Sequence, residues 1–203
     1  MKTILTSLLL ALFGEFVSLN AQVKILAFAG STRKDSFNKK LINQAAEMAR
    51  QQFGAQVTVI DLSDYALPIY NADFEKEQGM PESAKRLRAL MIQSDAILIA
   101  TPEYNASIPA LLKNTLDWVS RSEQGASARG DVFKGKRIGI MSASPGRRGG
   151  ARALAHLRAI IEDIGGAVIT EEVSIPLAVD YFAEKKKGEN VALKEELKQV
   201  LSK

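Results

Sequence analysis

Three stretches of small, polar and cationic residues are the places where this chain could do chemistry. They span residues 30–38, 101–109 and 142–150, and each begins where a short apolar segment ends. Their side chains are mostly hydroxyls, amides and arginines, which suit the binding of anions and of flat rings with polar edges. The chain has no cysteine, and its one histidine, His156, lies outside all three stretches. We therefore expect ligand binding here rather than chemistry by a protein nucleophile.

The first stretch is typical of a phosphate site. Ser31, Ser36 and Asn38 offer short polar side chains, and Arg33 offers a fork of N–H donors that matches phosphate oxygens. A helix that begins here would add free backbone N–H groups and the positive end of its dipole. Gly30 would let the chain turn without a Cβ clash. Together these groups could cradle a phosphate monoester.

The second and third stretches could bind a ring. Pro102 and Pro109 stiffen the second, where Tyr104 could stack on a flat ring and Asn105 could hydrogen-bond to its edge. The third stretch consists mainly of small residues, which would let a ligand approach the backbone closely. Its pair of arginines at 147 and 148 could hold an anion.

Each stretch also has a purely structural interpretation. Ser36 or Asp35 could simply cap a helix, and Ser107 could cap the next one. The third stretch could be a flexible loop with exposed arginines. His156 lies within a helical pattern, where a surface or interface position is the commoner outcome. Trp118 has helical spacing to apolar neighbours, which favours packing in the core or at a subunit interface.

Composition narrows the function classes. The absence of cysteine excludes zinc–thiolate sites, iron–sulfur clusters and catalytic thiols, and we expect no metal site. Hydrophobic residues make up 46% and charged residues 25%, as in an ordinary globular domain. The net charge of +4 is spread among acidic residues, without the basic stripe typical of nucleic-acid binding. These features favour a bound cofactor that carries the reaction.

Apolar segments alternate with helical patterns along the chain. The predicted strands are 23–29, 57–62, 96–100, 136–141 and a fifth that begins at 167. The predicted helices are 37–53, one that starts at Pro81, 109–120, 149–164 and 191–201. Residues 63–80 are rich in turn formers, so a long surface loop is expected there.

This alternation predicts an α/β fold with a doubly wound, five-stranded parallel sheet and helices on both faces. The strand order 2-1-3-4-5 fits five such units. In that order ligands bind at the carboxyl ends of the strands, beside strands 1 and 3. The three polar stretches follow strands 1, 3 and 4, where such a site would form.

Residues 1–21 differ from the remainder. A lysine, an apolar run and small residues resemble a secretory signal peptide. The alternative is a wrongly assigned start, with the domain beginning near residue 22. Both interpretations stay open, and in either case the folded domain is expected to span 22–203.

Three motifs in order resemble the NADPH-dependent FMN reductase family, which includes quinone, chromate and azo-dye reductases. They are G-S-T-R-x-x-S-x-N from residue 30, P-E-Y-N-x-S-x-P from residue 102 and L-K-N-x-x-D-W from residue 112. The resemblance runs from about residue 23 to about residue 176. It implies a flavodoxin-like fold and a homodimer or homotetramer in which the partner helps to close the flavin pocket.

The resemblance also assigns roles to residues. The FMN phosphate and ribityl chain would be held by Ser31, Arg33, Ser36 and Asn38. The isoalloxazine ring would be lined by Pro102, Glu103, Tyr104 and Asn105, and its other edge would be approached by Ser142, Ser144 and Gly146. NADPH or NADH would be the co-substrate, and the acceptor would be a quinone, an azo compound, a metal oxyanion or free flavin. The flavin, and no protein side chain, would carry the chemistry.

Other interpretations compete with this one. A flavodoxin-type electron carrier would bind FMN without turning over nicotinamide, but such carriers are strongly acidic and this chain is basic. A receiver-like phosphate-binding module would need acidic residues after the first strand, and none follow it directly. Within the enzyme class, FMN could be a held cofactor or a diffusible substrate. Use of reduced nicotinamide favours a cytoplasmic protein without stable membrane association, and export is the alternative if residues 1–21 are cleaved.

Overall fold

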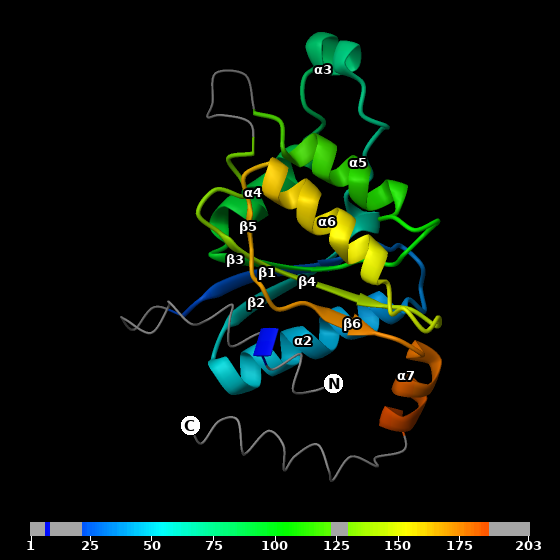
Figure 1. Ribbon diagram of the computed structural model, residues 1–203. Helices are drawn as coiled ribbons and strands as arrows, with labels where there is room; N and C mark the ends of the chain where they lie inside the picture. The colour runs from blue at the N-terminus through cyan, green and yellow to red at the C-terminus, as the bar shows by residue number, and fades with distance from the viewer. Residues whose placement is uncertain (1–6, 9–21, 123–129, 187–203) are drawn as a thin grey trace.

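The sheet has the predicted topology. The computed structural model describes residues 7–8, 22–122 and 130–186 (Figure 1). The strands are β1 Lys24–Ala29, β2 Gln56–Asp61, β3 Ala96–Ala100, β4 Arg137–Ala143, β5 Ala167–Val168 and β6 Val173–Ile175. All pair in parallel, in the order β2-β1-β3-β4-β5, and β6 also pairs with β4. The doubly wound α/β prediction is thus confirmed, with β6 as a small addition.

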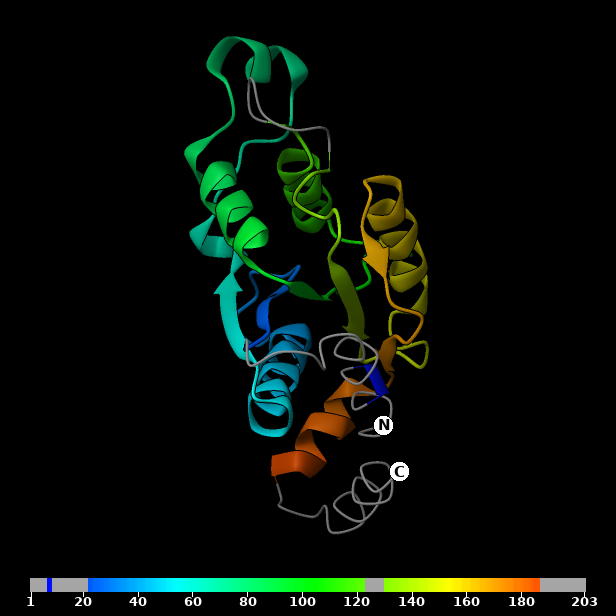
Figure 2. The same cartoon turned by 90° about the vertical axis from the view of Figure 1, so that its left-hand side faces the viewer.

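Helices cover both faces of this sheet (Figure 2). They are α2 Phe37–Phe53, α3 Ala72–Gln78, α4 Glu82–Gln93, α5 Ala110–Val119, α6 Ala151–Asp163 and α7 Ala178–Lys186. One apolar cluster packs α4, α5 and α6 on one face, and a second packs α2 and α7 on the other. Every residue of β3 is buried, as expected for a central parallel strand.

Local capping fixes α2 at the bounds that the sequence predicts. The Ser36 hydroxyl accepts a hydrogen bond from the backbone N–H of Lys39, which satisfies one of the free donors of the first turn. Gly54 ends the helix in the left-handed region at φ 64°, where a side chain would be strained. The start of α2 is therefore held in place directly after the first polar stretch.

The predicted loop over residues 63–80 is partly wrong. A 3₁₀ turn, η1 (Leu62–Asp64), and the helix α3 interrupt it. The Asn71 side chain caps α3 by accepting hydrogen bonds from two backbone N–H groups, and Gly79 ends it at φ 74°. No residue of α3 is buried, so the helix has no apolar stripe that periodicity could detect. The α3 segment projects from the domain at the top of Figure 1.

Trp118 packs in the core, as predicted. Its indole ring is buried, and Nε1 donates a hydrogen bond of 2.8 Å to the carbonyl oxygen of Pro68. The ring of Tyr70 meets it edge to face at 5.0 Å. Trp118 therefore anchors the segment that leads into α3 against α5.

The fifth strand is shorter than predicted. The chain leaves the ladder after β5 and pairs with β4 again as β6. Between them, the Arg158 guanidinium donates hydrogen bonds to the carbonyl oxygens of residues 168–170 and pairs with Glu172. This cation replaces ladder partners, which is why the strand can break. The sequence did not predict α7, and the predicted helix over 191–201 lies outside the described residues.

Of residues 1–21, the structure describes Ser7 and Leu8 alone. Leu8 is fully buried in the cluster on the α2 face. The interpretation of residues 1–21 otherwise lies outside the described residues. Within the described part of the chain, no helix combines the length and apolarity needed to cross a bilayer.

Candidate functional site

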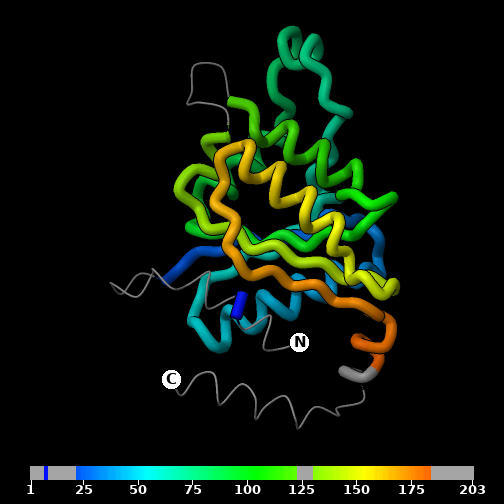
Figure 3. The backbone as a smooth tube through the Cα atoms, in the orientation of Figure 1, coloured from blue at the N-terminus to red at the C-terminus, as the bar shows by residue number. Residues whose placement is uncertain are grey.

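The three polar stretches lie side by side at the carboxyl edge of the sheet. Backbone hydrogen bonds of 2.8 Å join Gly30 to Ala100 and Thr101 to Met141, so the ends of β1, β3 and β4 are aligned. Figure 3 traces the three loops to the right-hand edge of the sheet. The structure therefore brings together the segments that the sequence singled out.

The first loop offers a cationic helix N-terminus. The Ser31 hydroxyl is buried and accepts a hydrogen bond from the backbone N–H of Arg33 at 3.3 Å, whereas the Arg33 side chain is exposed. Ser36 caps α2, and the first turn of α2 contains no acidic residue. Free N–H groups, the helix dipole and Arg33 together suit a phosphate group.

The Asn38 amide makes hydrogen bonds within the protein. Its Nδ2 donates to the carbonyl oxygen of Ala143 at 3.0 Å, and its Oδ1 accepts from the backbone N–H of Ala143 at 2.9 Å. Asn38 is buried, so both bonds are shielded from water. This pair ties α2 to the end of β4 and fixes the first loop relative to the third.

Gly30 allows close packing of α5 and is not needed for a turn. A Cβ on Gly30 would lie 2.9 Å from Cβ of Leu112, so a larger residue would push α5 away from the strand. Its φ is not in the left-handed region. The glycine thus lets α5 approach the end of β1 closely, which sets the distance between the first two loops.

The second loop ends in a tight turn. Tyr104 and Ser107 exchange two backbone hydrogen bonds of 2.9 and 3.1 Å, and Asn105 and Ala106 have φ of 50° and 67°. Positive φ at both central positions defines a type I′ turn. Tyr104 is 55% exposed, so its ring is accessible for stacking on a ligand.

Glu103 turns its carboxylate toward α6. Oε1 accepts hydrogen bonds from Nε (2.8 Å) and Nη2 of Arg152, and Oε2 accepts from the backbone N–H of Arg152 at 3.2 Å. The Glu103 side chain is only 10% exposed. The hydrogen bonds from the Arg152 side chain lower the pKa of Glu103 below its ordinary value. The carboxylate is therefore held charged.

The third loop packs tightly against the second. Ser142 is buried, and its Oγ donates a 2.6 Å hydrogen bond to the carbonyl oxygen of Thr101. The Ser144 Oγ accepts from the backbone N–H of Gly146 at 3.2 Å. A Cβ on Gly150 would lie 1.9 Å from Ser142 Oγ, so this position has no room for a side chain. The two arginines at 147 and 148 are exposed.

His156 is exposed on α6, in agreement with the predicted surface position. Its Nδ1 lies 3.0 Å from the Ser107 hydroxyl, at the end of the tight turn. Sequence reasoning did not pair these two residues, nor Glu103 with Arg152, because both pairs are 49 positions apart. No local pattern could have revealed contacts at that separation.

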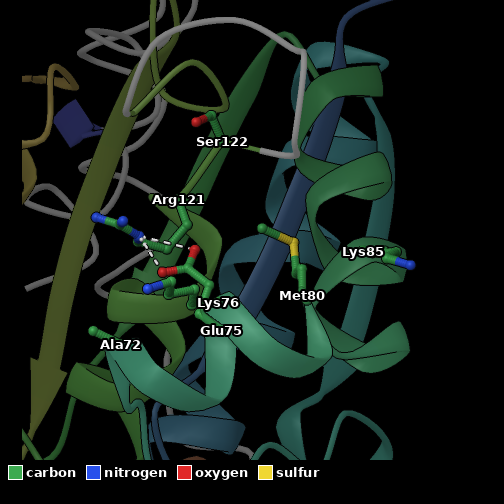
Figure 4. A pocket seen from close by; sticks show the side chains of 8 residues that line it. Ala72, Glu75, Lys76, Met80, Lys85, Arg121 and Ser122 are labelled. Carbon is green, nitrogen blue, oxygen red and sulfur yellow. Dashed lines mark hydrogen bonds and ion pairs between the residues drawn. The ribbon is translucent and has the colours of Figure 1, made fainter.

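A cavity of about 500 Å³ lies away from the strand ends, between α3 and the segment after α5 (Figure 4). Arg121 Nε donates to both carboxylate oxygens of Glu75 at 3.0 Å across it. Met80 and the stem of Lys85 form part of its wall. None of the residues that line this cavity belongs to the three polar stretches at the carboxyl edge of the sheet.

Comparison with known proteins now decides the family. The profile of the family described as NADPH-dependent FMN reductase matches residues 23–180, most of the chain. The chain belongs to this family. Membership makes it an FMN-dependent NAD(P)H oxidoreductase, as the resemblance predicted, and does not favour the electron-carrier alternative.

Named relatives of this FMN reductase family member include two bacterial quinone reductases. It is 39% identical over 138 residues to a 2-hydroxy-1,4-benzoquinone reductase of Burkholderia sp, covering 68% of this chain and 69% of the relative. It is 32% identical over 155 residues to a quinone reductase of Escherichia coli, covering 75% and 77%. Among solved structures, it resembles the flavoenzyme NAD(P)H:(acceptor) oxidoreductase FerB of Paracoccus denitrificans, with 33% identity, a TM-score of 0.63, and coverage of 75% and 79%.

Proposed function

We propose that this reductase holds FMN at the carboxyl edge of its sheet and passes electrons from NAD(P)H to quinones. The observation that carries this proposal is the start of α2, where the exposed Arg33 precedes a helix whose first turn contains no acidic residue, at the same edge of the sheet as the exposed Tyr104 ring. That pairing of an anion site with an accessible aromatic ring suits a flavin mononucleotide.

Three helices, α2, α5 and α6, begin near this edge. The loop before α5 contains no cationic residue, so it offers no counter-charge to a phosphate. The N-terminus of α6 already receives the Glu103 carboxylate, so an added phosphate would meet a like charge there. The first turn of α2 has no acidic residue. We therefore place the FMN phosphate at α2, with Ser31, Arg33 and Ser36 nearest to it and Asn38 holding the loop in place through Ala143.

The second and third loops would then flank the isoalloxazine ring. When bound, FMN accepts hydride from reduced nicotinamide and returns electrons to an acceptor. Pro102 and the Tyr104–Asn105 turn would line one side of the ring, and residues 142–146 would approach its other edge. Ser142 and its bond to Thr101 fix the spacing of these two loops. The chain thus supplies binding and orientation, and no side chain needs to act as a general base.

The acceptor is proposed to be a quinone because relatives at 39% and 32% identity are named for quinones. A quinone is flat and small, which suits stacking over an exposed ring face. Azo compounds, metal oxyanions and free flavin are the other acceptor classes to compare. Initial rates with NADPH and with NADH give the preferred nicotinamide.

Assembly and location form part of the same proposal. We infer a homodimer or homotetramer, since residues 69–78, which include α3, expose the large apolar side chains of Ile69 (77%) and Phe74 (38%). A cytoplasmic location without stable membrane association or nucleic-acid binding fits the use of reduced nicotinamide and a mixed surface charge.

The test separates a held cofactor from a diffusible flavin. FMN-loaded protein is desalted, and the flavin that stays with it is measured by absorbance. Initial rates with NADPH are then compared for a benzoquinone and for free FMN. Retained flavin and faster reduction of the quinone are expected. Loss of all flavin on desalting, with free FMN the better acceptor, would contradict the held-cofactor proposal.

A further inference from the structure

We propose that Glu103 is a positioning residue, which fixes the ring-binding loop by capping the N-terminus of α6 from a different segment. This inference rests on the proposed FMN site, of which the loop 101–109 is one wall. In this loop, the Glu103 side chain binds to the N-terminus of α6, and the backbone lines the proposed FMN site.

The need for such a cap follows from the start of α6. Its N-cap residue is Gly150, which provides no side-chain hydrogen bond to the first turn. Gly149 and Gly150 have φ of 58° and 86°, and Cβ atoms there would lie 2.3 and 1.9 Å from the hydroxyl oxygens of Ser174 and Ser142. A serine, threonine or aspartate therefore cannot occupy the cap position. The free N–H groups of α6 need an acceptor from elsewhere in the fold.

Glu103 supplies that acceptor. Its carboxylate receives the backbone N–H of Arg152 at 3.2 Å and also the Arg152 guanidinium. A carboxylate at a helix N-terminus gains from the dipole as well as from the hydrogen bonds. Because Glu103 directly precedes the Tyr104–Ser107 turn, fixing its side chain fixes the start of that turn.

The end of the turn is tied to the same helix. Ser107 Oγ lies 3.0 Å from Nδ1 of His156, one turn along α6 from Arg152. The Tyr104–Ser107 turn is thus held to α6 on both sides. Movement of α6, or loss of either tie, would move the wall of the ring site.

The charge of Glu103 should also affect the midpoint potential of the flavin. A bare carboxylate beside a flavin would disfavour the more negative, reduced form. Arg152 and the N-terminus of α6 compensate the charge of Glu103. Removing Arg152 while keeping Glu103 should therefore shift the flavin midpoint potential in the negative direction, an effect that a purely structural role would not produce.

The experiment measures FMN affinity of the apoprotein by fluorescence titration for Glu103→Ala, Glu103→Gln and Arg152→Ala. Glu82→Ala is the control, because Glu82 also pairs with a cation, Lys85 at 2.6 Å, but lies in the first turn of α4 and not in the loop 101–109. We expect Glu103→Ala to raise the FMN dissociation constant about tenfold, in line with the loss of a charged hydrogen bond. Glu103→Gln keeps an acceptor and should recover part of the loss, and the control should bind like wild type.

Two results would overturn the inference. One is wild-type FMN affinity in folded Glu103→Ala, and the other is a midpoint potential in Arg152→Ala equal to that of wild type. If Glu103→Ala does not fold, Glu103→Gln and Arg152→Ala still decide the matter through affinity and potential. A wild-type protein that binds no FMN would instead contradict the proposed function, and this inference would fall with it.

Discussion

Arg33 is the exposed cation beside the first turn of α2, and we propose that it binds the FMN phosphate. Arg33→Ala should raise the dissociation constant of FMN about 10- to 100-fold, because a charged hydrogen bond contributes roughly 1.5–3 kcal/mol. Titration of apoprotein with FMN measures this. Lys34→Ala, a change to the neighbouring exposed cation, is the control and should have a much smaller effect. Equal effects of the two variants would show general charge attraction and no specific phosphate contact.

Ala106 occupies a position that favours glycine. It is the second central residue of the type I′ turn, at φ 67°, where Asn-Gly is the preferred pair. Ala106→Gly should therefore raise the free energy of unfolding by roughly 0.5–1 kcal/mol, since it relieves left-handed strain. Urea unfolding at neutral pH checks this. Unchanged or reduced stability would mean that the methyl group makes contacts that outweigh the strain.

Glu103 should make stability depend on pH in a known direction. Hydrogen bonds from Arg152 lower its pKa from the ordinary value of 4.5, so the folded protein binds fewer protons than the unfolded chain. The stability gained is fully present above about pH 5 and is lost as the pH falls through the lowered pKa. Urea unfolding of wild type and Glu103→Gln between pH 3 and 7 should show a difference that shrinks in acid. A difference independent of pH would contradict this.

At the residue scale, sequence could predict local roles and not distant ones. Ser36 as a cap and Gly54 as a stop depend on neighbours within five positions, so a local pattern predicts both. Asn38 was expected near the ligand, but its partner Ala143 is 105 positions away. That contact depends on strand order and on the close packing of α2 against the end of β4. The types of these two residues do not predict that they are in contact.

Among the elements, α4 and α5 are joined by a buried charge. Arg88 is 2% exposed, and it pairs with both carboxylate oxygens of Asp131 at 2.9 Å and with the carbonyl oxygens of Val119 and Arg121. Arg88→Met should lower the free energy of unfolding by about 3–5 kcal/mol, because it removes the cation that pairs with both oxygens of a largely buried carboxylate.

Urea unfolding of Arg88→Met tests this, with Arg86→Met as the control. Arg86 is exposed on the same helix, so its replacement should cost under about 1 kcal/mol. A similar small loss for both variants would show that solvent reaches Asp131 and compensates the missing cation.

The elements show why periodicity succeeds for some segments and fails for others. Strand β3 and helix α2 have strong apolar patterns, and their predicted bounds match the structure. The helix α3 buries no residue, and its ends are set by Asn71 and Gly79. Its sequence therefore has no apolar pattern and predicts a loop. The break between β5 and β6 depends on Arg158 of α6, which no strand pattern contains.

For the whole molecule, the order of apolar segments was enough to predict the sheet. Right-handed parallel crossovers leave few topologies, and the ligand edge follows from the strand order. The sequence therefore located the candidate site at the loops after β1, β3 and β4. It did not reveal how Ser142, Glu103 and Asn38 interlock these loops, because side-chain packing across the edge is a property of the folded chain.

As an FMN-dependent reductase, this chain should bind FMN and use it to oxidise NAD(P)H. The most direct measurement is the visible absorption spectrum of FMN-loaded protein without oxygen, before and after NADPH and then after a benzoquinone. We expect flavin bands that bleach with NADPH and return in proportion to the quinone added. A protein that takes up no FMN, or whose flavin bands persist with both NADPH and NADH, would contradict the claim.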